Sequence, residues 1–261
     1  MNQAERRVWL INALLNERPD GCSIAVPAGA NEQRDLLRAL MNVRPPEALA
    51  AETLEIQDTY LQQRLLERGG ATDASTLPYR DRVAIWRGDI TLLKTDAIVN
   101  AANSQMLGCF VPGHSCIDNA IHTYAGMQLR LACANLMDEQ GHEEPTAHVK
   151  VTPAFNLPSS YVFHTVGPIA PSHKPGPREE LLLRRCYTSC LEEATRRELD
   201  TLAFCCISTG VFGYPQEAAA RVAIDTVRHH LDPNDPDLKV IFNVFLASDE
   251  AIYRSLLQTN R

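Results

Sequence analysis

From Arg82 onward the chain alternates short runs of β-branched and aromatic residues with longer segments of helical spacing. This alternation is typical of α/β domains, in which strands form one sheet and the intervening helices cover both of its faces. The expected strands are residues 83–86, 97–99, 148–155, 161–166, 202–207 and 239–246. The expected helices are residues 117–137, 179–199, 215–231 and 250–258. We therefore predict a layered α/β sheet covered by helices on both sides.

The first part of the chain has a different pattern. Apolar residues recur at helical spacing near residues 9–14, 36–41 and 61–66, and we expect helices there. Turn-forming stretches at 18–21 and 44–46 separate these helices, and 67–70 ends the last one. A polar stretch at 71–78, with Thr, Ser and Pro, is the expected boundary. The sequence thus predicts a helical N-terminal extension, residues 1–77, followed by an α/β domain, residues 78–261.

Length and charge limit the classes of function. The chain has 261 residues, 45% of them hydrophobic, which is enough to bury a full core. Its formal net charge of -7 provides no overall positive field, which argues against non-specific binding to nucleic acid or anionic membrane. No apolar run is long enough to span a bilayer, and Asn12 interrupts the apolar patch near the start, unlike a cleaved signal. We therefore expect a cytoplasmic protein with neither nucleic acid nor membrane as partner.

The chain has eight cysteines, and without an export signal we expect most of them to be free thiols. Cys205 and Cys206 are neighbours in an apolar run, where their side chains point to opposite faces of a strand. Buried thiols behave as small hydrophobic groups. The cysteines that need no further function are therefore Cys22, Cys133, Cys186, Cys190, Cys205 and Cys206. Cys109 and Cys116 remain to be explained.

Loops that follow strands are the expected ligand site, because open α/β sheets bind ligands at the carboxyl ends of their strands. In the first such loop, the carboxylate of Asp89 before Ile90 suits an amino group on a base, although Gly-Asp is more often an ordinary turn. In the second, a buried strand runs into Asn100 and Asn103, whose amides suit sugar hydroxyls as well as a helix cap or turn. Each pattern alone is compatible with plain structure.

A third loop follows the predicted strand at 202–207. It consists of Ser208, Thr209, Gly210, Val211 and Phe212. Its glycine allows backbone N–H groups to converge on an anion, helped by the positive end of the following helix. The dinucleotide fingerprint and the Walker lysine are both absent. A plain turn explains this loop as well as a phosphate site does.

A fourth stretch crowds reactive side chains together. Residues 108–119 read Gly-Cys-Phe-Val-Pro-Gly-His-Ser-Cys-Ile-Asp-Asn. Cys109, His114 and Cys116 thus fall within eight positions, with Asp118 just behind them. The stretch runs into the helix that we expect from residue 117.

Taken together, these four loops resemble those of a macrodomain, the ADP-ribose-binding module. Gly-Asp-Ile-Thr, Asn-Ala-Ala-Asn and Ser-Thr-Gly-Val-Phe-Gly-Tyr-Pro occur in the macrodomain order over about residues 82–257. The resemblance implies a three-layer α/β fold with a mixed central sheet. It also implies that Asp89 and Ile90 contact adenine, that Asn103 holds the distal ribose, and that residues 208–212 surround the diphosphate.

The fourth stretch stands where hydrolytic macrodomains commonly have a glycine-rich loop. Here the chain resembles the zinc-dependent macrodomains of microbial mono-ADP-ribosyl-protein hydrolases, whose pattern is Cys-x4-His-x-Cys followed by Ile-Asp-Asn and Ile-His. The matching residues are Cys109, His114, Cys116, Asp118 and His122. The resemblance implies Zn²⁺ as cofactor.

The residue types agree with that implication. Two thiolates and an imidazole suit Zn²⁺, and three protein ligands leave the fourth tetrahedral position for water or substrate, as in catalytic sites. Cys109, His114 and Cys116 are the expected ligands, and Cys116, Ile117 and Asp118 are expected to lie beside the substrate. His122, one turn beyond Asp118, is expected to orient or pack the helix rather than to bind the metal.

The predicted function is zinc-assisted hydrolysis of the bond between the distal ribose of ADP-ribose and a modified protein side chain. Asp118 is the candidate to orient or deprotonate the attacking water, and the residues leave open whether the metal polarises an oxygen or activates water. The alternatives are a reader that binds ADP-ribose without cleaving it, and a hydrolase of a free ADP-ribose derivative. The expected partner is an ADP-ribosylated protein; because some members of this family act beside a lipoyl-carrier protein, such a carrier is a candidate.

Overall fold

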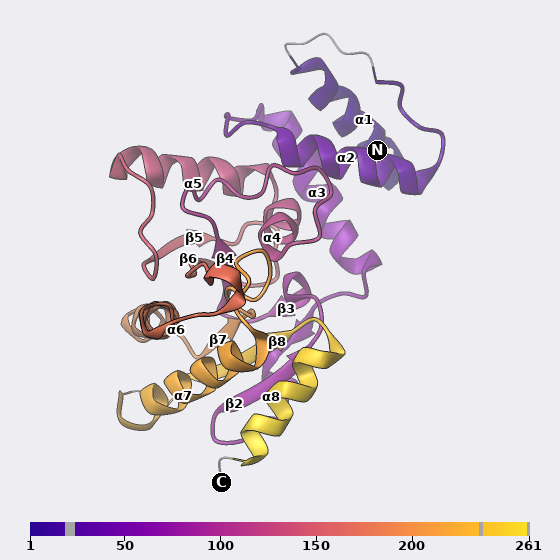
Figure 1. The fold of residues 1–261 in the computed structure, drawn as a ribbon. Helices are drawn as coiled ribbons and strands as arrows, with labels where there is room; N and C mark the ends of the chain where they lie inside the picture. Colours follow the sequence, from indigo (N-terminus) through magenta and orange to yellow (C-terminus); the bar gives the residue numbers. More distant parts are fainter. Residues whose placement is uncertain (19–23, 235–236, 260–261) are drawn as a thin grey trace.

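The computed structural model describes residues 1–18, 24–234 and 237–259, and its centre is a six-stranded sheet (Figure 1). The strand order is β2-β8-β7-β4-β6-β5. Five neighbouring strands are parallel: β2 (Val83–Arg87), β8 (Lys239–Val244), β7 (Thr201–Phe204), β4 (Ala97–Ala102) and β6 (Tyr161–Val166). The edge strand β5 (Val149–Pro153) runs antiparallel to β6. The sheet is therefore mixed, as predicted.

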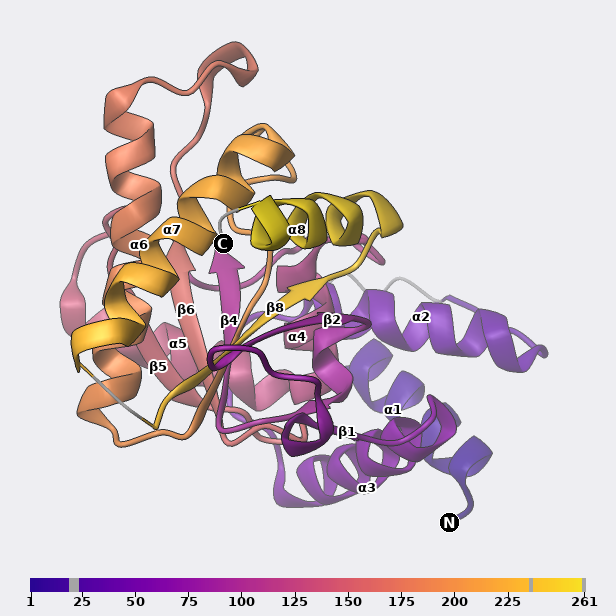
Figure 2. The same ribbon diagram turned by 90° about the horizontal axis from the view of Figure 1, so that it is seen from below.

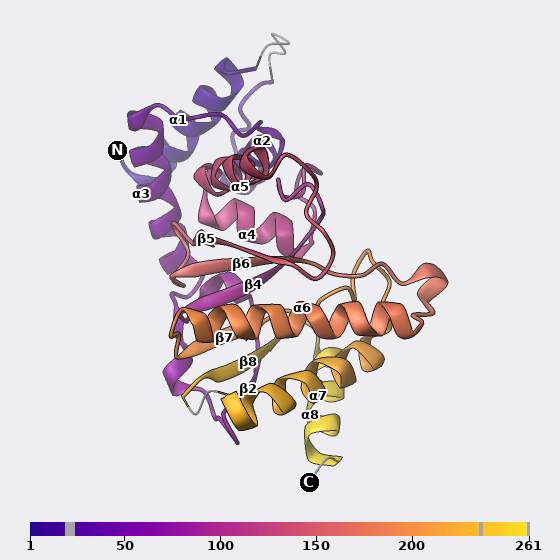
Figure 3. The same ribbon diagram turned by 90° about the vertical axis from the view of Figure 1, so that its left-hand side faces the viewer.

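Helices cover both faces of the sheet (Figures 2 and 3). On one face lie α4 (Ile117–Ala125) and α5 (Met127–Gln140). On the other, α6 (Pro177–Arg196), α7 (Gln216–Asn234) and α8 (Ala247–Thr259) pack side by side. Central strands covered on both faces are mostly apolar, and Ala97, Ile98 and Val99 of β4 are fully buried. The predicted three-layer α/β fold is confirmed.

The prediction of one helix over residues 117–137 was wrong. Gly126 separates α4 from α5, with a φ of 99° that is open to glycine but not to residues with a Cβ. The position is also crowded, since a Cβ there would lie 2.8 Å from Nε2 of Gln57. Hydrophobic spacing runs through this glycine without interruption, which is why the sequence pattern did not show the break. The expected strands at 148–155, 202–207 and 239–246 are also shorter than predicted.

Three helices precede the sheet: α1 (Gln3–Asn16), α2 (Ala30–Val43) and α3 (Ala51–Glu67). They lie beside α4 and α5, at the end of the molecule opposite the C-terminus in Figure 1. They share an apolar core of their own, into which α5 contributes Met127; its other buried members are Leu10, Ile11, Leu14, Leu37, Leu40, Met41, Ile56, Tyr60 and Leu61. The predicted helical extension is confirmed. Most of the turn predicted at 18–21 lies outside the described residues.

The stretch predicted as the domain boundary is itself ordered against the α/β part of the chain. Its residues form β1 (Thr72–Asp73), which pairs in parallel with β3 (Leu93–Lys94), and the short helix η1 (Ala74–Thr76). Two more short helices follow, η2 (Ile90–Leu92) and η3 (Pro171–His173). These elements have too few residues to produce a periodic pattern, so the sequence did not predict them.

The described cysteines are all free thiols, as expected, and Cys22 lies outside the described residues. Four of them, Cys133, Cys186, Cys190 and Cys205, are buried, and Cys206 is half-buried. No helix in the described ranges has the length and apolar character required to cross a membrane.

Candidate active site

The predicted site residues lie at the carboxyl edge of the parallel strands. Asp89 follows β2, Asn103 follows β4, and residues 208–212 follow β7. Because these strands are parallel, their carboxyl ends share one edge of the sheet. Phe245 follows β8 at the same edge, with its side chain 72% exposed, and the sequence analysis missed it. Its neighbour Val244 accepts a hydrogen bond from the N–H of Gly88, which places Phe245 beside the Asp89 turn.

Asp89 caps the short helix η2 and is held from two sides. Its Oδ1 accepts hydrogen bonds from the backbone N–H and the hydroxyl of Thr91, at 3.0 and 2.7 Å. Its Oδ2 accepts from Arg68, at the end of α3, at 2.5 Å, and the same guanidinium lies over the ring of Tyr124. Ile90 is buried. The carboxylate is thus fixed in place, and each of its oxygens keeps capacity to accept a further donor.

Asn103 forms a turn at the end of β4. Its Oδ1 accepts from the N–H groups of Gln105 and Met106 at 3.0 and 3.2 Å, as in an Asx turn. Its Nδ2 has only a long contact, 3.4 Å, with the carbonyl oxygen of Gly108. The amide nitrogen is therefore the atom that remains suited to bind an external hydroxyl.

The loop at residues 208–212, called here the β7–α7 loop, has an unusual backbone. Ser208 has a φ of 67°, which is uncommon for a residue with a Cβ, and its buried Oγ has no hydrogen-bond partner within the described chain. Among the described residues, the N–H groups of Gly210, Val211 and Phe212 also have no acceptor. Consecutive free N–H groups near the start of α7 suit an anion.

Phe212 joins the β7–α7 loop to the Asn103 turn. Its side chain packs against the buried cluster of Ala102, Met106 and Val166, which lies at the ends of β4 and β6. The two segments are far apart in sequence, and this contact brings them together at the sheet edge.

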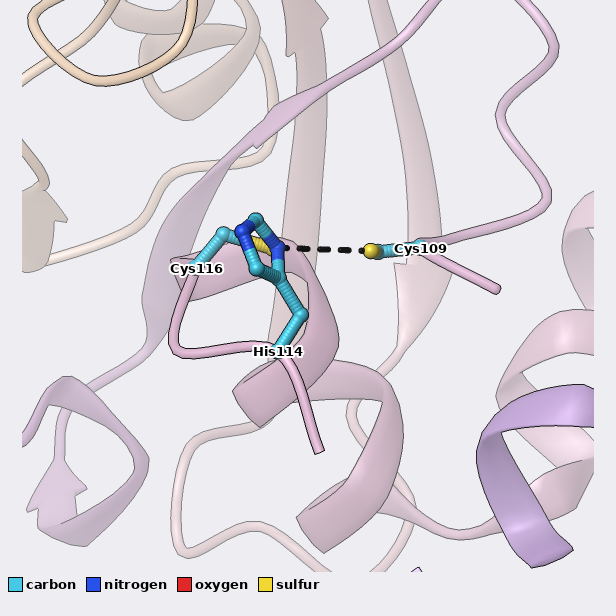
Figure 4. A group of neighbouring side chains, drawn as sticks. All are labelled: Cys109, His114 and Cys116. Atoms are coloured by element: carbon cyan, nitrogen blue, oxygen red, sulfur yellow. Dashed lines mark hydrogen bonds between the residues drawn. The ribbon is translucent and has the colours of Figure 1, made fainter. Parts of the chain in front are cut away.

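The cysteine loop, residues 109–116, brings its three potential ligands together (Figure 4). Cys109 and His114 come from irregular backbone, and Cys116 is the N-cap of α4. Their donor atoms all lie within 4.8 Å of one another, and Sγ of Cys109 is 3.5 Å from Nδ1 of His114. Tetrahedral Zn²⁺ with ordinary bond lengths would hold a sulfur and a nitrogen about 3.6 Å apart. The donor set and its spacing therefore fit a zinc ion.

The charges around Cys116 also fit a cation. Burial raises the pKa of this thiol to about 11, and the neighbouring Cys109 and Asp118 act in the same direction. The N–H of Asn119 donates to the Cys116 sulfur at 3.4 Å, which favours the thiolate. A bound divalent cation deprotonates a coordinating thiol outright, so it would offset the cost of burial.

Asp118 lies in the first turn of α4 and is buried. Its Oδ1 accepts a hydrogen bond from Nδ2 of Asn100 at 2.8 Å and lies 3.6 Å from Nε2 of His122. Burial raises the pKa of Asp118 to about 6, although Asn100 and the charge of Arg130 lower it in part. A carboxyl group of this kind can exchange a proton near neutral pH.

A buried polar chain extends from Asp118 into the sheet, and sequence reasoning missed it. Asn100 also lies 3.1 Å from Nδ1 of His164, whose Nε2 lies 2.9 Å from the hydroxyl of Thr152. The imidazoles of His122 and His164 and the thiol of Cys133 form a second, fully buried group of donors. Burial lowers the pKa of His164 to about 3 and that of His122 well below its usual value, so both rings are neutral.

His122 packs as expected. Gly108, with a φ of 78°, lies so close to the ring that a Cβ there would be 2.8 Å from it. The imidazole therefore packs directly against the backbone of Gly108, just before the cysteine loop.

Comparisons with known proteins agree with this geometry. The Macro domain family model matches residues 99–223, which span the Asn103 turn, the cysteine loop and the β7–α7 loop. The chain is 51% identical to a protein-ADP-ribose hydrolase of Treponema medium, over 98% of this chain and all of the relative. It is 44% identical to the protein-ADP-ribose hydrolase of Staphylococcus aureus (strain MRSA252), over 95% of this chain and 94% of the relative.

A solved structure shows the same relationship. The Trypanosoma brucei macrodomain in complex with ADP-ribose superimposes with a TM-score of 0.64 at 30% identity, covering 84% of this chain and 94% of that one. A mixed sheet between helical layers, with ligand-directed loops at its carboxyl edge, defines an α/β ligand-binding domain. The chain belongs to the macrodomain family.

Proposed function

We propose that this macrodomain hydrolyses the bond between the distal ribose of ADP-ribose and a modified protein side chain, assisted by Zn²⁺ in the cysteine loop. The observation that carries the proposal is the convergence of Cys109, His114 and Cys116 beside the buried carboxylate of Asp118. The relatives at 51% and 44% identity, both named protein-ADP-ribose hydrolase, support the same reaction.

Each segment of the sheet edge has a part in holding the substrate. The N–H groups of the β7–α7 loop would bind the diphosphate, because three consecutive donors without acceptors among the described residues lie shortly before the start of α7. The carboxylate of Asp89 would accept the adenine amino group, and the exposed ring of Phe245 beside it would pack on the base. The amide nitrogen of Asn103 would donate to the distal ribose. Cys116, Ile117 and Asp118 would then lie next to the scissile bond.

The chemistry requires a group that handles a proton and a group that stabilises charge. Cys109, His114 and Cys116 would hold the zinc ion, which when bound supplies a Lewis acid or lowers the pKa of a bound water. Asp118 would orient the attacking water and take its proton. Its hydrogen bond from Asn100 fixes the direction of the carboxylate, so the second oxygen stays available for that water.

The test is incubation of the purified chain with a mono-ADP-ribosylated protein and, separately, with free ADP-ribose derivatives, followed by mass spectrometry. Release of ADP-ribose from the protein alone supports the proposal. Binding without release would identify a reader, and release from the free derivative alone would identify a different hydrolase.

A lipoyl-carrier protein is a proposed target. The test is to modify this carrier with ADP-ribose and to compare the rate of ADP-ribose release with that from an unrelated modified protein. The proposed cytoplasmic location is supported by the free thiols.

A further inference from the structure

The cysteine loop has little backbone structure of its own. Its internal backbone hydrogen bond runs from the N–H of His114 to the carbonyl oxygen of Val111 at 3.2 Å. Two of the three proposed ligands lie on this irregular segment. A loop that is free to move must lose conformational entropy when it closes on a metal ion, so affinity depends on what holds it beforehand.

The first support is Asn119, a fully buried residue of α4. Its Nδ2 donates to the carbonyl oxygens of Val111, at 3.1 Å, and Cys109, at 3.5 Å. Its Oδ1 accepts from Nε and Nη2 of Arg38 on α2, at 3.2 and 2.7 Å. Because the guanidinium can only donate, it requires the amide oxygen on its own side, which leaves the amide nitrogen facing the cysteine loop.

The second support comes directly from α2. Nη2 of Arg38 also donates to the carbonyl oxygen of His114, one of the proposed ligands, at 2.9 Å. One turn further along α2, Oδ1 of Asn42 accepts from the N–H of Gly113 at 3.0 Å, and its Nδ2 donates to the hydroxyl of Thr123 at 3.0 Å. Residues four apart share a helix face, so one face of α2 contacts both the loop and α4.

The position of α2 is itself fixed from the α/β layers. The guanidinium of Arg130, on α5, donates to the carbonyl oxygens of Met41 at 3.4 Å and Arg44 at 2.5 Å, at the end of α2. It also donates to the carbonyl oxygen of Leu107 at 2.7 Å and lies over the ring of Phe110, at the start of the cysteine loop. A single buried side chain therefore ties the end of α2 to the beginning of the loop.

We infer that the N-terminal helices form part of the metal site, with Arg38 and Asn42 of α2 as positioning residues that hold the cysteine loop ready for its ion. This inference rests on the proposed zinc function and adds a role for the N-terminal helices. The sequence alone left two roles open for these helices, shaping substrate access or merely covering the sheet. Arg38 of α2 donates a hydrogen bond to the backbone of His114, a proposed ligand, so the role of these helices goes beyond covering the sheet.

The test uses Arg38→Ala and Asn42→Ala in the full chain. Zinc affinity is measured by competition with a chelator, and each variant is expected to lose about tenfold to hundredfold, the range found when groups that support metal ligands are removed. With Co²⁺ in place of zinc, the visible spectrum is expected to change in both variants, since it reports the arrangement of the thiolates and the imidazole. Urea unfolding checks that both variants remain folded.

The matched control is Arg34→Ala. Arg34 lies one turn before Arg38 on α2 and pairs with the exposed Asn31, so its loss is expected to leave zinc affinity and the Co²⁺ spectrum unchanged. Arg38→Lys is expected to restore only part of the affinity, because one ammonium group cannot reproduce the planar guanidinium contacts to both Asn119 and His114. Wild-type zinc affinity and Co²⁺ spectrum in Arg38→Ala and Asn42→Ala would overturn the inference.

A second readout separates failure of this inference from failure of the proposed function. If the wild-type chain takes up no zinc, the zinc assignment itself is wrong. Hydrogen exchange in the metal-free chain then decides whether α2 holds the loop. Faster exchange of residues 109–116 in Asn42→Ala than in Arg34→Ala would then support the positioning of the loop by α2 without a metal role, and equal exchange would overturn the positioning as well.

Discussion

The β7–α7 loop and the cysteine loop lie at the same end of the sheet but are held in different ways. The β7–α7 loop is held mostly by backbone hydrogen bonds: the carbonyl oxygens of Ser208 and Gly210 accept from the N–H groups of Tyr214 at 3.0 Å and Gly213 at 2.9 Å, and that of Phe212 accepts from the N–H of Ala170 at 2.8 Å. The cysteine loop depends on side chains of α2, α4 and α5. The first loop therefore depends mainly on backbone hydrogen bonds and the second on side chains from three helices. Binding of ADP-ribose and binding of zinc should consequently be separable by mutation.

The largest effect is expected from removing both thiolates of the cysteine loop. Cys109→Ser with Cys116→Ser should abolish zinc binding, measured by elemental analysis, and release of ADP-ribose from a modified protein, because one imidazole cannot hold the ion. Affinity for free ADP-ribose, measured by calorimetry, should change by less than about fivefold, or 1 kcal/mol, if the other loop carries binding. Cys206→Ser, at a half-buried thiol outside the loop, is the control and should keep its zinc. If the double variant binds no zinc but still releases ADP-ribose, the metal assignment is wrong.

The next effect concerns Asp118, which is bonded to Asn100 in the structure. Asp118→Asn keeps the size of the side chain and an oxygen for that bond, but it removes the proton acceptor. Turnover should fall about a hundredfold or more, while zinc content and ADP-ribose affinity stay near those of the wild type. Near-normal turnover would show that Asp118 is not the base. Loss of zinc would instead make the carboxylate a support for the ligands.

The difference between contacts that are close in sequence and contacts that are distant explains what the sequence predicted. The strand at 97–99 was recognisable because burial on both faces favours an apolar run, but its continuation through Asn100 to Ala102 was not predicted. The cysteine loop was recognisable because its ligands are close in sequence, although their roles remain predictions. The break at Gly126 was not, since its φ of 99° leaves no periodic trace.

The contacts that surround the loop could not be predicted for a related reason. Arg38 and Asn119 are 81 positions apart, and Asn100 and His164 are 64 apart. Sequence patterns relate residues only a few positions apart. Residues at these larger separations come together only when the helices and strands pack against one another. For the same reason the N-terminal helices were correctly predicted as helices, but their contact with the cysteine loop was not.

A smaller effect is expected at Gly210. Substitution there should weaken ADP-ribose binding and leave zinc binding unchanged, which is the reverse of the result expected for the cysteine variant. A Cβ there would have no protein atom within 4 Å, so Gly210→Val should leave the fold intact and interfere only with a ligand at the loop. The valine side chain should displace the diphosphate from at least one backbone N–H, and losing one such hydrogen bond to a charged group should weaken ADP-ribose binding about tenfold to hundredfold. Calorimetry measures this loss, and zinc content should not change. Gly210→Ala should show a smaller loss, and unchanged affinity in the valine variant would refute the placement of the diphosphate.

The smallest expected effect concerns the ion pair that joins α3 to the Asp89 turn. Arg68→Ala removes the contact with Oδ2 of Asp89 and the packing of the guanidinium over the ring of Tyr124. A partly exposed ion pair and a cation–π contact together stabilise a protein by about 1 kcal/mol, and urea unfolding should show a loss of that order. Arg64→Ala, which removes a pair with Glu67 within α3, is the control and should cost less than about 0.5 kcal/mol. Zinc affinity should be unchanged in both variants, because Arg68 contacts the proposed adenine end of the site while Arg38 contacts the cysteine loop. Equal stability of the two variants would show that the Asp89 turn does not depend on its contact with α3.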